Sequence, residues 1–255
     1  MEVFAADNPR LVDHFRAHGW VLTEDLDVDE VALLKRWVED VARTVDSPGE
    51  ILHYRELTDF GPKLCRTENF VPVHRELREL LTVRLAAVAS RLIGEDAVLY
   101  KEKINYKLAG GAGFSPHQDA PAYPFIDNHV SCMVAVDDAT PDNGCLEVVS
   151  DCHDEVLPLD DRGCIRPEVV TQLRWEPVPL LAGQTLWFHS RTPHRSGANR
   201  SLTDRRALFP TYNAASEGDL RARYYAEKLS IFASNLSADR VVLSLIGDFE
   251  GRPVD

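Results

Sequence analysis

The chain has 255 residues, of which 41 are acidic and 28 basic, and its formal net charge at pH 7 is -13. A surface of this sign repels nucleic acid and anionic membranes, so we expect neither as a partner, and an anionic ligand would have to meet a local group of cations. No linker, internal repeat, secretory signal or long apolar segment stands out, which predicts a single cytoplasmic domain over residues 1–255 and leaves the oligomeric state open.

Residues 1–96 carry two helical patterns. Apolar residues recur at helical spacing from Asp29 to Val45, with Asp27 or Asp29 as the N-cap, and again from Arg75 to Ile93, where Gly94 ends the pattern. We expect both helices to pack on the outside of a β-barrel as scaffolding. A third helical pattern, at residues 220–232, is rich in charge and is interpreted as a flap or a surface helix.

After residue 96 the pattern changes to β-rich runs separated by Pro, Gly and Asp turns, at residues 97–108, 130–136, 145–149, 179–188 and 206–213. Many short strands of this kind favour a mainly β fold, a double-stranded β-helix (jelly roll) with flanking α-helices. The core is then expected at about 97–213, between helical additions at about 1–96 and a C-terminal extension at 214–255. Five cysteines show no C-x-x-C pair, so we expect reduced thiols and no zinc cluster.

His117 and Asp119 form an H-x-D motif. Alternate residues of a strand face the same way, so this motif aims an imidazole and a carboxylate at one point. A second histidine from another strand, His194, would complete the two-His, one-carboxylate set that holds Fe(II) in non-heme oxygenases. His189 is the alternative third ligand, and His194 is preferred because Arg205, which stands after it, begins a clear strand.

Arg205 strengthens the metal interpretation. A guanidinium held inside a barrel needs a partner, and a carboxylate is the partner that Arg binds with two hydrogen bonds. Arg206 would point to the opposite face of the same strand, toward the surface or a helix.

The chain resembles the phytanoyl-CoA dioxygenase family of Fe(II)/2-oxoglutarate oxygenases. The matching stretches are residues 113–119 (GFSPHQD), 142–149 (DNGCLEVV), 181–190 (LAGQTLWFHS) and 194–199 (HRSGAN), followed by Arg205. The resemblance implies a jelly roll, Fe(II) held by the catalytic residues His117, Asp119 and His194, 2-oxoglutarate held by Arg205 and Asn105, and O2 as the oxidant. Residues 150–153 (SDCH) depart from the family's usual turn, which leaves that loop uncertain.

One face of the first β-rich run is cationic. Lys101, Lys103, Asn105 and Lys107 alternate along it, which by itself favours a solvated outer edge over an anion pocket. In the family the corresponding strand lines the active site, so the resemblance reverses the preference and implies that Lys103 or Lys101 meets the substrate.

Residues 101–123 look most like the branch of the family that hydroxylates small aminophosphonates, such as 2-aminoethylphosphonate and its N-methylated relatives. A phosphonate needs Lys or Arg and an ammonium needs a carboxylate or an aromatic face. Arg66, Glu68, Tyr123 and Tyr54 offer both, although Tyr54 and Glu68 could equally lie in an ordinary polar loop. The expected partner is therefore a small-molecule substrate, an aminophosphonate such as 2-aminoethylphosphonate or an N-methylated relative.

Other interpretations stay open. The same oxygenase chemistry could act on an amino acid or a natural-product intermediate, and it could desaturate or cyclise the substrate. From other classes, a zinc-dependent hydrolase or lyase could use two histidines and an aspartate but gives Arg205 no role. A non-catalytic jelly-roll binding protein would need no metal.

Overall fold

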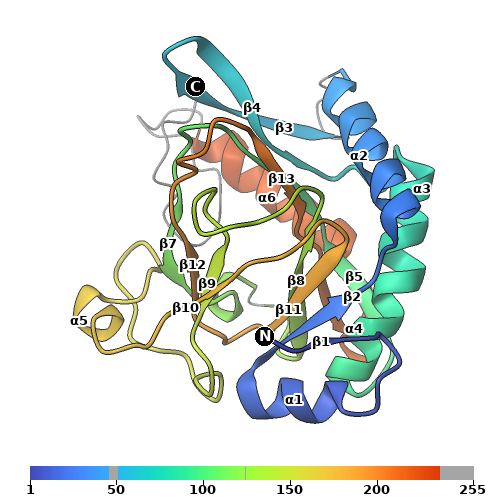
Figure 1. The fold of residues 1–255 in the computed structure, drawn as a ribbon, viewed down its shortest axis with the longest axis vertical. Helices are drawn as coiled ribbons and strands as arrows, with labels where there is room; N and C mark the ends of the chain where they lie inside the picture. The colour runs from blue at the N-terminus through green and yellow to red at the C-terminus, as the bar shows by residue number, and fades with distance from the viewer. Residues whose placement is uncertain (46–50, 124, 236–255) are drawn as a thin grey trace.

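In the computed structural model, which describes residues 1–45, 51–123 and 125–235, two β-sheets pack face to face as a jelly roll (Figure 1). The large sheet runs β1 (Val3–Phe4), β2 (Trp20–Glu24), β11 (Gln184–His189), β8 (His129–Ala135), β13 (Arg205–Leu208), β6 (Lys103–Lys107), β4 (Gly61–Glu68) and β3 (Leu52–Thr58), and β14 (Thr211–Ala214) pairs with β8 and with β5 (Ala97–Lys101). The small sheet runs β10 (Glu176–Val178), β9 (Leu146–Val148), β12 (His194–Ser196) and β7 (Phe114–His117). This is the predicted fold class.

The two sheets meet through alternating apolar side chains. Met133, Leu186 and Phe188 of the large sheet pack in one cluster with Leu146 and Val148 of the small sheet. Because successive side chains of a strand point to opposite faces, the same strands also present a second set of side chains outward, toward the helices. The space between the sheets beyond this cluster holds the polar groups described below.

Helices cover the outer face of the large sheet (Figure 1). They are α1 (Leu11–His18), α2 (Val28–Arg43), and a continuous helical run made of α3 (Arg75–Glu79), the π-helical turn η1 (Leu80–Leu85) and α4 (Ala86–Ile93). Asp27 caps α2 in a reciprocal capping box with Glu30, and Gly94 ends α4 at a φ of 92°. Both predicted helices therefore form, the second with a π-helical turn that the periodicity did not reveal.

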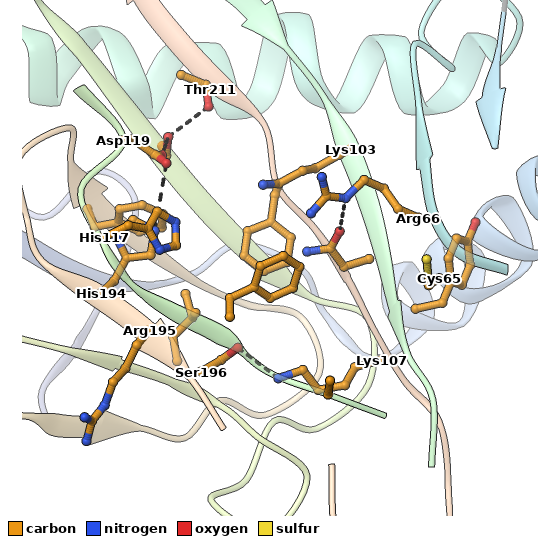
Figure 2. A pocket seen from close by; sticks show the side chains of 18 of the residues that line it. Cys65, Arg66, Lys103, Lys107, His117, Asp119, His194, Arg195, Ser196 and Thr211 are labelled. Atoms are coloured by element: carbon orange, nitrogen blue, oxygen red, sulfur yellow. Dashed lines mark hydrogen bonds and ion pairs between the residues drawn. The ribbon is translucent and has the colours of Figure 1, made fainter. Parts of the chain in front are cut away.

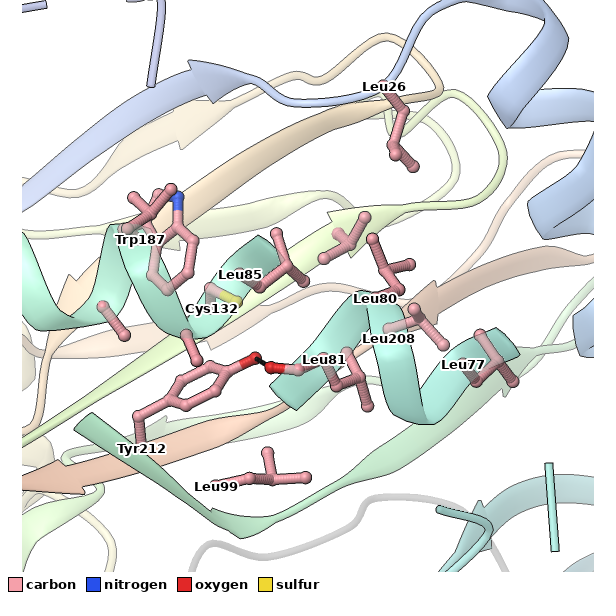
Figure 3. Close-up of a cluster of buried hydrophobic side chains, with 14 of the residues drawn as sticks. Leu26, Leu77, Leu80, Leu81, Leu85, Leu99, Cys132, Trp187, Leu208 and Tyr212 are labelled. Carbon is pink, nitrogen blue, oxygen red and sulfur yellow. Dashed lines mark hydrogen bonds between the residues drawn. The ribbon is translucent and has the colours of Figure 1, made fainter. Parts of the chain in front are cut away.

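Leucines of the second helical run pack against the sheet (Figure 3). Leu81 and Leu85 lie in one buried cluster with Trp187 and Tyr212, and the Tyr212 hydroxyl donates to the Leu81 carbonyl at 2.9 Å. Burial of each leucine side chain contributes about 1.5 to 3 kcal/mol to the free energy of folding. The helices are thus scaffolding, as predicted, and they fix the outer face of the strands whose inner face carries the site.

Residues 52–68 form a β-hairpin, so the polar-loop interpretation of Tyr54 and Glu68 is wrong. β4 pairs with β3 and with β6, which extends the large sheet and leaves the end of the hairpin projecting beyond the barrel (Figure 1). The hairpin lacks regular polar and apolar alternation because its inner face is itself polar. Arg66 and Glu68 lie on that face beside Asn105 and Lys103.

The predicted strand at 97–108 is divided at Glu102. β5 pairs with β14, whereas β6 pairs with β13 and β4. The buried Glu102 carboxylate accepts from the backbone N–H of Val71 at 3.0 Å and from Arg221 Nε at 3.0 Å. These two partners explain how an acidic side chain is tolerated inside the protein between β5 and β6, which pair with different strands.

The C-terminal helix α6 (Arg221–Asn235) is a surface helix with one buried face, and Arg223 and Glu227 are among its exposed side chains. It packs on β5 and buries Tyr224, Tyr225 and Lys228. Its charges suggested a solvated helix, but Arg221 pairs with buried Glu102 and Lys228 with buried Glu68. Residues 236–255 of the predicted C-terminal extension lie outside the described residues.

Three smaller features concern a turn, the thiols and the membrane-spanning potential of the helices. The Gly-rich segment before β7 is a turn, and a Cβ on Gly113 would lie 2.1 Å from the Ser196 carbonyl oxygen, so glycine allows β7 to approach β12. All five cysteines are free thiols, four of them buried. Within the described ranges, no helix combines the length and the apolar character needed to cross a membrane.

Candidate metal centre and active site

Three potential metal ligands converge between the sheets (Figure 2). His117 ends β7, Asp119 follows in the turn that opens the short helix η2 (Ala120–Ala122), and His194 begins β12, opposite His117 in the antiparallel register. One ligand atom from each side chain lies within 4.8 Å of the others. The exposed fractions of the three residues are 8%, 6% and 5%. The pairing of β7 with β12 thus brings His117 and His194 together. Asp119 lies beyond the strand with helical backbone angles, so the turn, and not the expected strand alternation, directs its carboxylate toward them.

Hydrogen bonds fix the orientation of each ligand. The Nδ1 atom of His117 lies 2.7 Å from the Ser115 carbonyl, and that of His194 lies 3.0 Å from the Thr192 carbonyl. A carbonyl oxygen can only accept, so Nδ1 carries the proton in both rings and the Nε2 lone pair is left for a metal. Asp119 Oδ2 accepts from Ser131 Oγ at 2.6 Å, which leaves Oδ1 available.

The charges also suit a divalent cation. Burial lowers the pKa of His117 to about 3 and lowers that of His194, so both rings are neutral at pH 7. Burial alone would raise the pKa of Asp119, but His194 and Lys101 outweigh it and the pKa is lowered. Two neutral imidazoles and one carboxylate on one side of a pocket are a donor set that fits Fe(II) and leaves positions open.

His189 lies away from this centre. It ends β11, and its Nδ1 accepts from the backbone N–H of Arg191 at 3.1 Å. Its ring contacts His153, with centroids 5.3 Å apart, and Phe15. The geometry therefore brings His194, and not His189, together with His117 and Asp119.

Arg205 begins β13, opposite Lys107 of β6, and is 3% exposed. Its Nη2 donates to the Gly144 carbonyl at 2.9 Å, while within the described part of the chain Nε and Nη1 have no hydrogen-bond partner. Burial lowers its pKa to about 10, so the group is still charged at pH 7. A buried guanidinium with two unused donors requires an anion, and the far carboxylate of 2-oxoglutarate has the matching shape.

Arg206 points outward, as predicted from strand alternation. Its Nε lies 2.8 Å from Asp137 Oδ2, and its Nη1 lies 3.3 Å from Glu39 of α2. Only Arg205 of the two arginines lines the pocket.

Two further groups beside Arg205 were missed in the sequence. Lys107 Nζ donates to Ser196 Oγ at 2.9 Å, and both side chains line the pocket. Ser196 follows the ligand His194 by two positions on the same strand, so strand alternation could have found it. Lys107 was seen on the cationic face but was given no role. With Arg205, these groups form a polar end of the pocket.

The cationic face lines the pocket from Lys101 to Lys107, and it is no solvated edge. Lys101 Nζ lies 4.6 Å from the Tyr123 ring centre and Lys103 Nζ lies 5.3 Å from that of Phe209. Over the residues that the structure describes, neither amine forms an ion pair with a carboxylate. Burial lowers the pKa of both lysines. Both amines lie near enough to the metal site for Asp119 to act on their pKa values, but neither is in ion-pair contact with a carboxylate of the described residues.

Arg66 and Asn105 stand side by side on this wall, with Arg66 Nε donating to Asn105 Oδ1 at 3.0 Å. Glu68 lies just behind the lining, 3.5 Å from Arg66 Nη1 and in an ion pair with Lys228. Tyr123 is part of the lining. The structure thus places Arg66, Lys101, Lys103 and Tyr123 in the pocket lining, whereas Glu68 and Tyr54 are not among the lining residues. Figure 2 shows Arg66 and Lys103 close together on this wall.

Comparison with known proteins identifies relatives of this site. The family model described as phytanoyl-CoA dioxygenase (PhyH) matches residues 15–207. A methylphosphonate hydroxylase of Gimesia maris is 43% identical over 247 residues, covering 95% of each chain. A 2-aminoethylphosphonate dioxygenase of an uncultured bacterium, HF130_AEPn_1, is 38% identical over 205 residues, covering 78% of each chain.

Among solved structures, the non-heme alpha-ketoglutarate-dependent epimerase SnoN from nogalamycin biosynthesis superposes with a TM-score of 0.68 and 26% identity. The superposition covers 81% of this chain and 82% of SnoN. A superposition of this extent shows that the two chains share their fold.

Proposed function

The chain belongs to the phytanoyl-CoA dioxygenase family and is an Fe(II)/2-oxoglutarate-dependent oxygenase, and from this premise we propose that it hydroxylates a small phosphonate at the carbon next to phosphorus. His117, Asp119 and His194 are the proposed metal ligands, and Arg205 is the proposed anchor of 2-oxoglutarate. The two curated relatives, which by name act on phosphonates, support the substrate class.

The observation that carries the proposal is the pair of buried amines on Lys101 and Lys103. Their pKa values are lowered by burial, and in the described structure no carboxylate forms an ion pair with either. A phosphonate oxygen would supply that missing anion through charge-assisted hydrogen bonds, each contributing about 1.5 to 3 kcal/mol. Among the described residues, the pocket lining holds six cationic side chains and only two carboxylates, Glu56 and Asp119.

Different side chains of the pocket bind the cosubstrate and the substrate. Arg205, with Ser196 and Lys107 beside it, holds the far carboxylate of 2-oxoglutarate, and Asn105 lies between that end and the substrate end. Lys101 and Lys103 hold the phosphonate so that its neighbouring carbon faces the metal side of the pocket, and the rings of Phe188, Phe209 and Tyr123 help to exclude water. Bound Fe(II) supplies the O2-dependent oxidation that couples conversion of 2-oxoglutarate to succinate and CO2 with hydroxylation of a C–H bond.

A substrate panel tests the proposal. Reconstituted enzyme is given Fe(II), 2-oxoglutarate and O2 with methylphosphonate, ethylphosphonate, 2-aminoethylphosphonate, and the matched carboxylates propionate and β-alanine. We expect succinate formation stimulated by phosphonates and a hydroxylated product seen by mass spectrometry. Stimulation by the carboxylates alone would contradict the phosphonate assignment and favour the alternative class of amino acid or natural-product substrates.

We propose that the described helices, sheets and C-terminal helix act as one domain, in the cytoplasm, on a freely diffusing small molecule, with no nucleic-acid or membrane partner. The net charge of -13 supports the last point. Cell fractionation of the tagged chain would test the location.

A further inference from the structure

Lys228 of α6 lies inside the protein, beside the substrate end of the pocket. It is 1% exposed and forms an ion pair with Glu68. Its Nζ also lies 5.2 Å from the ring centre of Tyr54 and 6.0 Å from that of Tyr224. One carboxylate and two aromatic faces around a cation are the surroundings that proteins use to bind an alkylammonium group. Here the cation belongs to the protein itself.

These surroundings border the wall that is proposed to hold the phosphonate. Glu68 stands opposite Lys103 in the register of β4 and β6, on the same face as Arg66. Glu68 is also 3.5 Å from Arg66 Nη1, so two cations share its charge. Burial by itself would raise the pKa of Glu68, but Lys228 and Arg66 outweigh it and the pKa is lowered. The carboxylate is therefore ionised and already neutralised.

Among the described residues that line the pocket, a substrate ammonium would find no other suitable carboxylate. Of the two carboxylates that line the pocket in the described structure, Asp119 belongs to the metal ligand set and Glu56 lies near Lys107, at the end assigned to 2-oxoglutarate. The amines of Lys101 and Lys103 would repel an ammonium group. Burial lowers the pKa of Lys228 to about 8, with Glu68 opposing the shift, so this amine is mostly charged at pH 7.

We propose that Lys228 fills, from within the chain, the position that would hold a substrate ammonium group, so that this enzyme selects phosphonates that lack a cationic group. The inference rests on the proposed phosphonate hydroxylation and names a specificity-determining residue on α6. The sequence led us to expect an aminophosphonate, with Glu68 and Tyr54 binding its amino group. Because Lys228 already contacts both residues, we now expect a phosphonate without an amino group.

The first test uses the unaltered enzyme with two substrates of similar size, ethylphosphonate and 2-aminoethylphosphonate. We expect kcat/KM for ethylphosphonate to exceed that for the amine by about ten- to a hundredfold, the effect of one unmatched charged contact. Equal or better turnover of 2-aminoethylphosphonate overturns the proposal, and this arm depends on no variant.

The second test uses variants that should change the preference between the two substrates. Lys228→Ala removes the internal cation and leaves Glu68 with the two rings, so the substrate ratio should shift toward 2-aminoethylphosphonate by about tenfold or more. In Lys228→Ala/Glu68→Gln the carboxylate is gone as well, and the shift should disappear. A ratio that stays at the parent value in Lys228→Ala contradicts the assignment.

A binding test separates this inference from the proposed function, because it needs no turnover. Ethylammonium chloride, compared with sodium chloride at equal ionic strength, should raise the Tm of metal-free Lys228→Ala and leave the parent and the double variant unchanged. If the parent turns over no phosphonate, the proposed function fails, and the ethylammonium shift still decides whether Lys228 fills a cation site. Absence of the shift in folded Lys228→Ala, checked by circular dichroism, counts against it.

Discussion

The two ends of the pocket are built on different principles. At the metal end, His117, His194 and Arg205 come from strands of both sheets, and each has backbone carbonyls that fix its orientation while other nitrogens face the pocket. At the substrate end, Arg66 comes from the β3–β4 hairpin and Lys228 from α6, outside the region of the sequence motifs. Their charges are balanced by other side chains rather than by the backbone.

This difference suggests that the metal end carries out the reaction and that the substrate end determines which substrate is accepted. Backbone partners hold a side chain wherever the strands pair, so the metal end should keep its geometry whatever the substrate. Side-chain partners can be exchanged one at a time without breaking a sheet, so the substrate end is the part that a few substitutions can re-specify. Changes at the metal end should therefore affect all substrates, and changes at the substrate end should affect their ranking.

The largest expected effect is at Asp119. Asp119→Ala removes the only carboxylate of the ligand set, and we expect hydroxylated product to fall below detection with every phosphonate, because this group both offsets metal charge and fixes its position. Product analysis by mass spectrometry checks it. Parental yield in this variant would show that Asp119 is not a ligand. It would also contradict the idea that changes at the metal end affect every substrate.

The histidines give a matched pair of variants. His194→Ala should lose the absorption band of the anaerobic Fe(II)/2-oxoglutarate complex, whereas His189→Ala should keep it, because His189 faces His153 and Phe15 rather than the pocket. Anaerobic titration with Fe(II) and 2-oxoglutarate measures both. The reverse result would move the third ligand to His189.

At Arg205 the expected loss concerns the cosubstrate. Arg205→Gln should raise the KM for 2-oxoglutarate by about ten- to a hundredfold or more, because charge-assisted hydrogen bonds contribute about 1.5 to 3 kcal/mol each. The exposed Arg200→Gln is the control and should leave this KM unchanged. A normal KM in Arg205→Gln would assign the anchor to another cation, with Lys107 as the first candidate.

Lys103 tests the substrate end. In Lys103→Ala the affinity for Fe(II) and 2-oxoglutarate should stay nearly unchanged, while kcat/KM for the phosphonate falls by about ten- to a hundredfold. Succinate formed without hydroxylated product should rise, since the cosubstrate still reacts when the substrate is poorly held. Lys63→Ala, on the exposed part of β4, removes the same charge as a control. Parental turnover in Lys103→Ala would remove this residue from the substrate site.

The smallest expected effect is the acid sensitivity of the metal-free protein. Burial lowers the pKa of His117 to about 3, and that of His129 and His189 to about 4. The unfolded chain takes up these protons near pH 6.5 and the folded chain does not, so stability is fully present above pH 6.5 and is lost as the pH falls toward 4. Urea unfolding at pH 7 and pH 5 should show a lower midpoint at pH 5.

His129→Gln should make that pH dependence shallower, because it removes one of the buried histidines whose pKa is lowered in the folded protein. A dependence as steep as that of the parent would indicate that His129 accepts a proton in the folded state. Burial lowers the pKa of Lys228 only to about 8, above this range, so Lys228→Ala should leave the loss of stability between pH 6.5 and pH 4 unchanged.

The sequence by itself predicted the jelly roll, the two outer helices and the set of His117, Asp119, His194 and Arg205. It could do so because strand alternation and capping are local rules, and because the motif spacing matches a known family. The assignment of roles to the individual site residues, and of one domain to the whole chain, stays a prediction. Even the opposite faces of Arg205 and Arg206 follow from neighbouring positions on one strand.

Only the tertiary structure decided which charges face the pocket. Nothing in the local pattern of residues 52–68 or 221–230 shows that Glu68 and Lys228, far apart in the chain, meet inside the protein. A polar residue looks solvated in sequence unless its partner is known, and that partner is chosen by the packing of α6 and the hairpin around β5 and β6. The type of reaction could therefore be predicted from residues close together in the sequence. The surroundings of the substrate depend on buried charges that pair although they are far apart in the sequence.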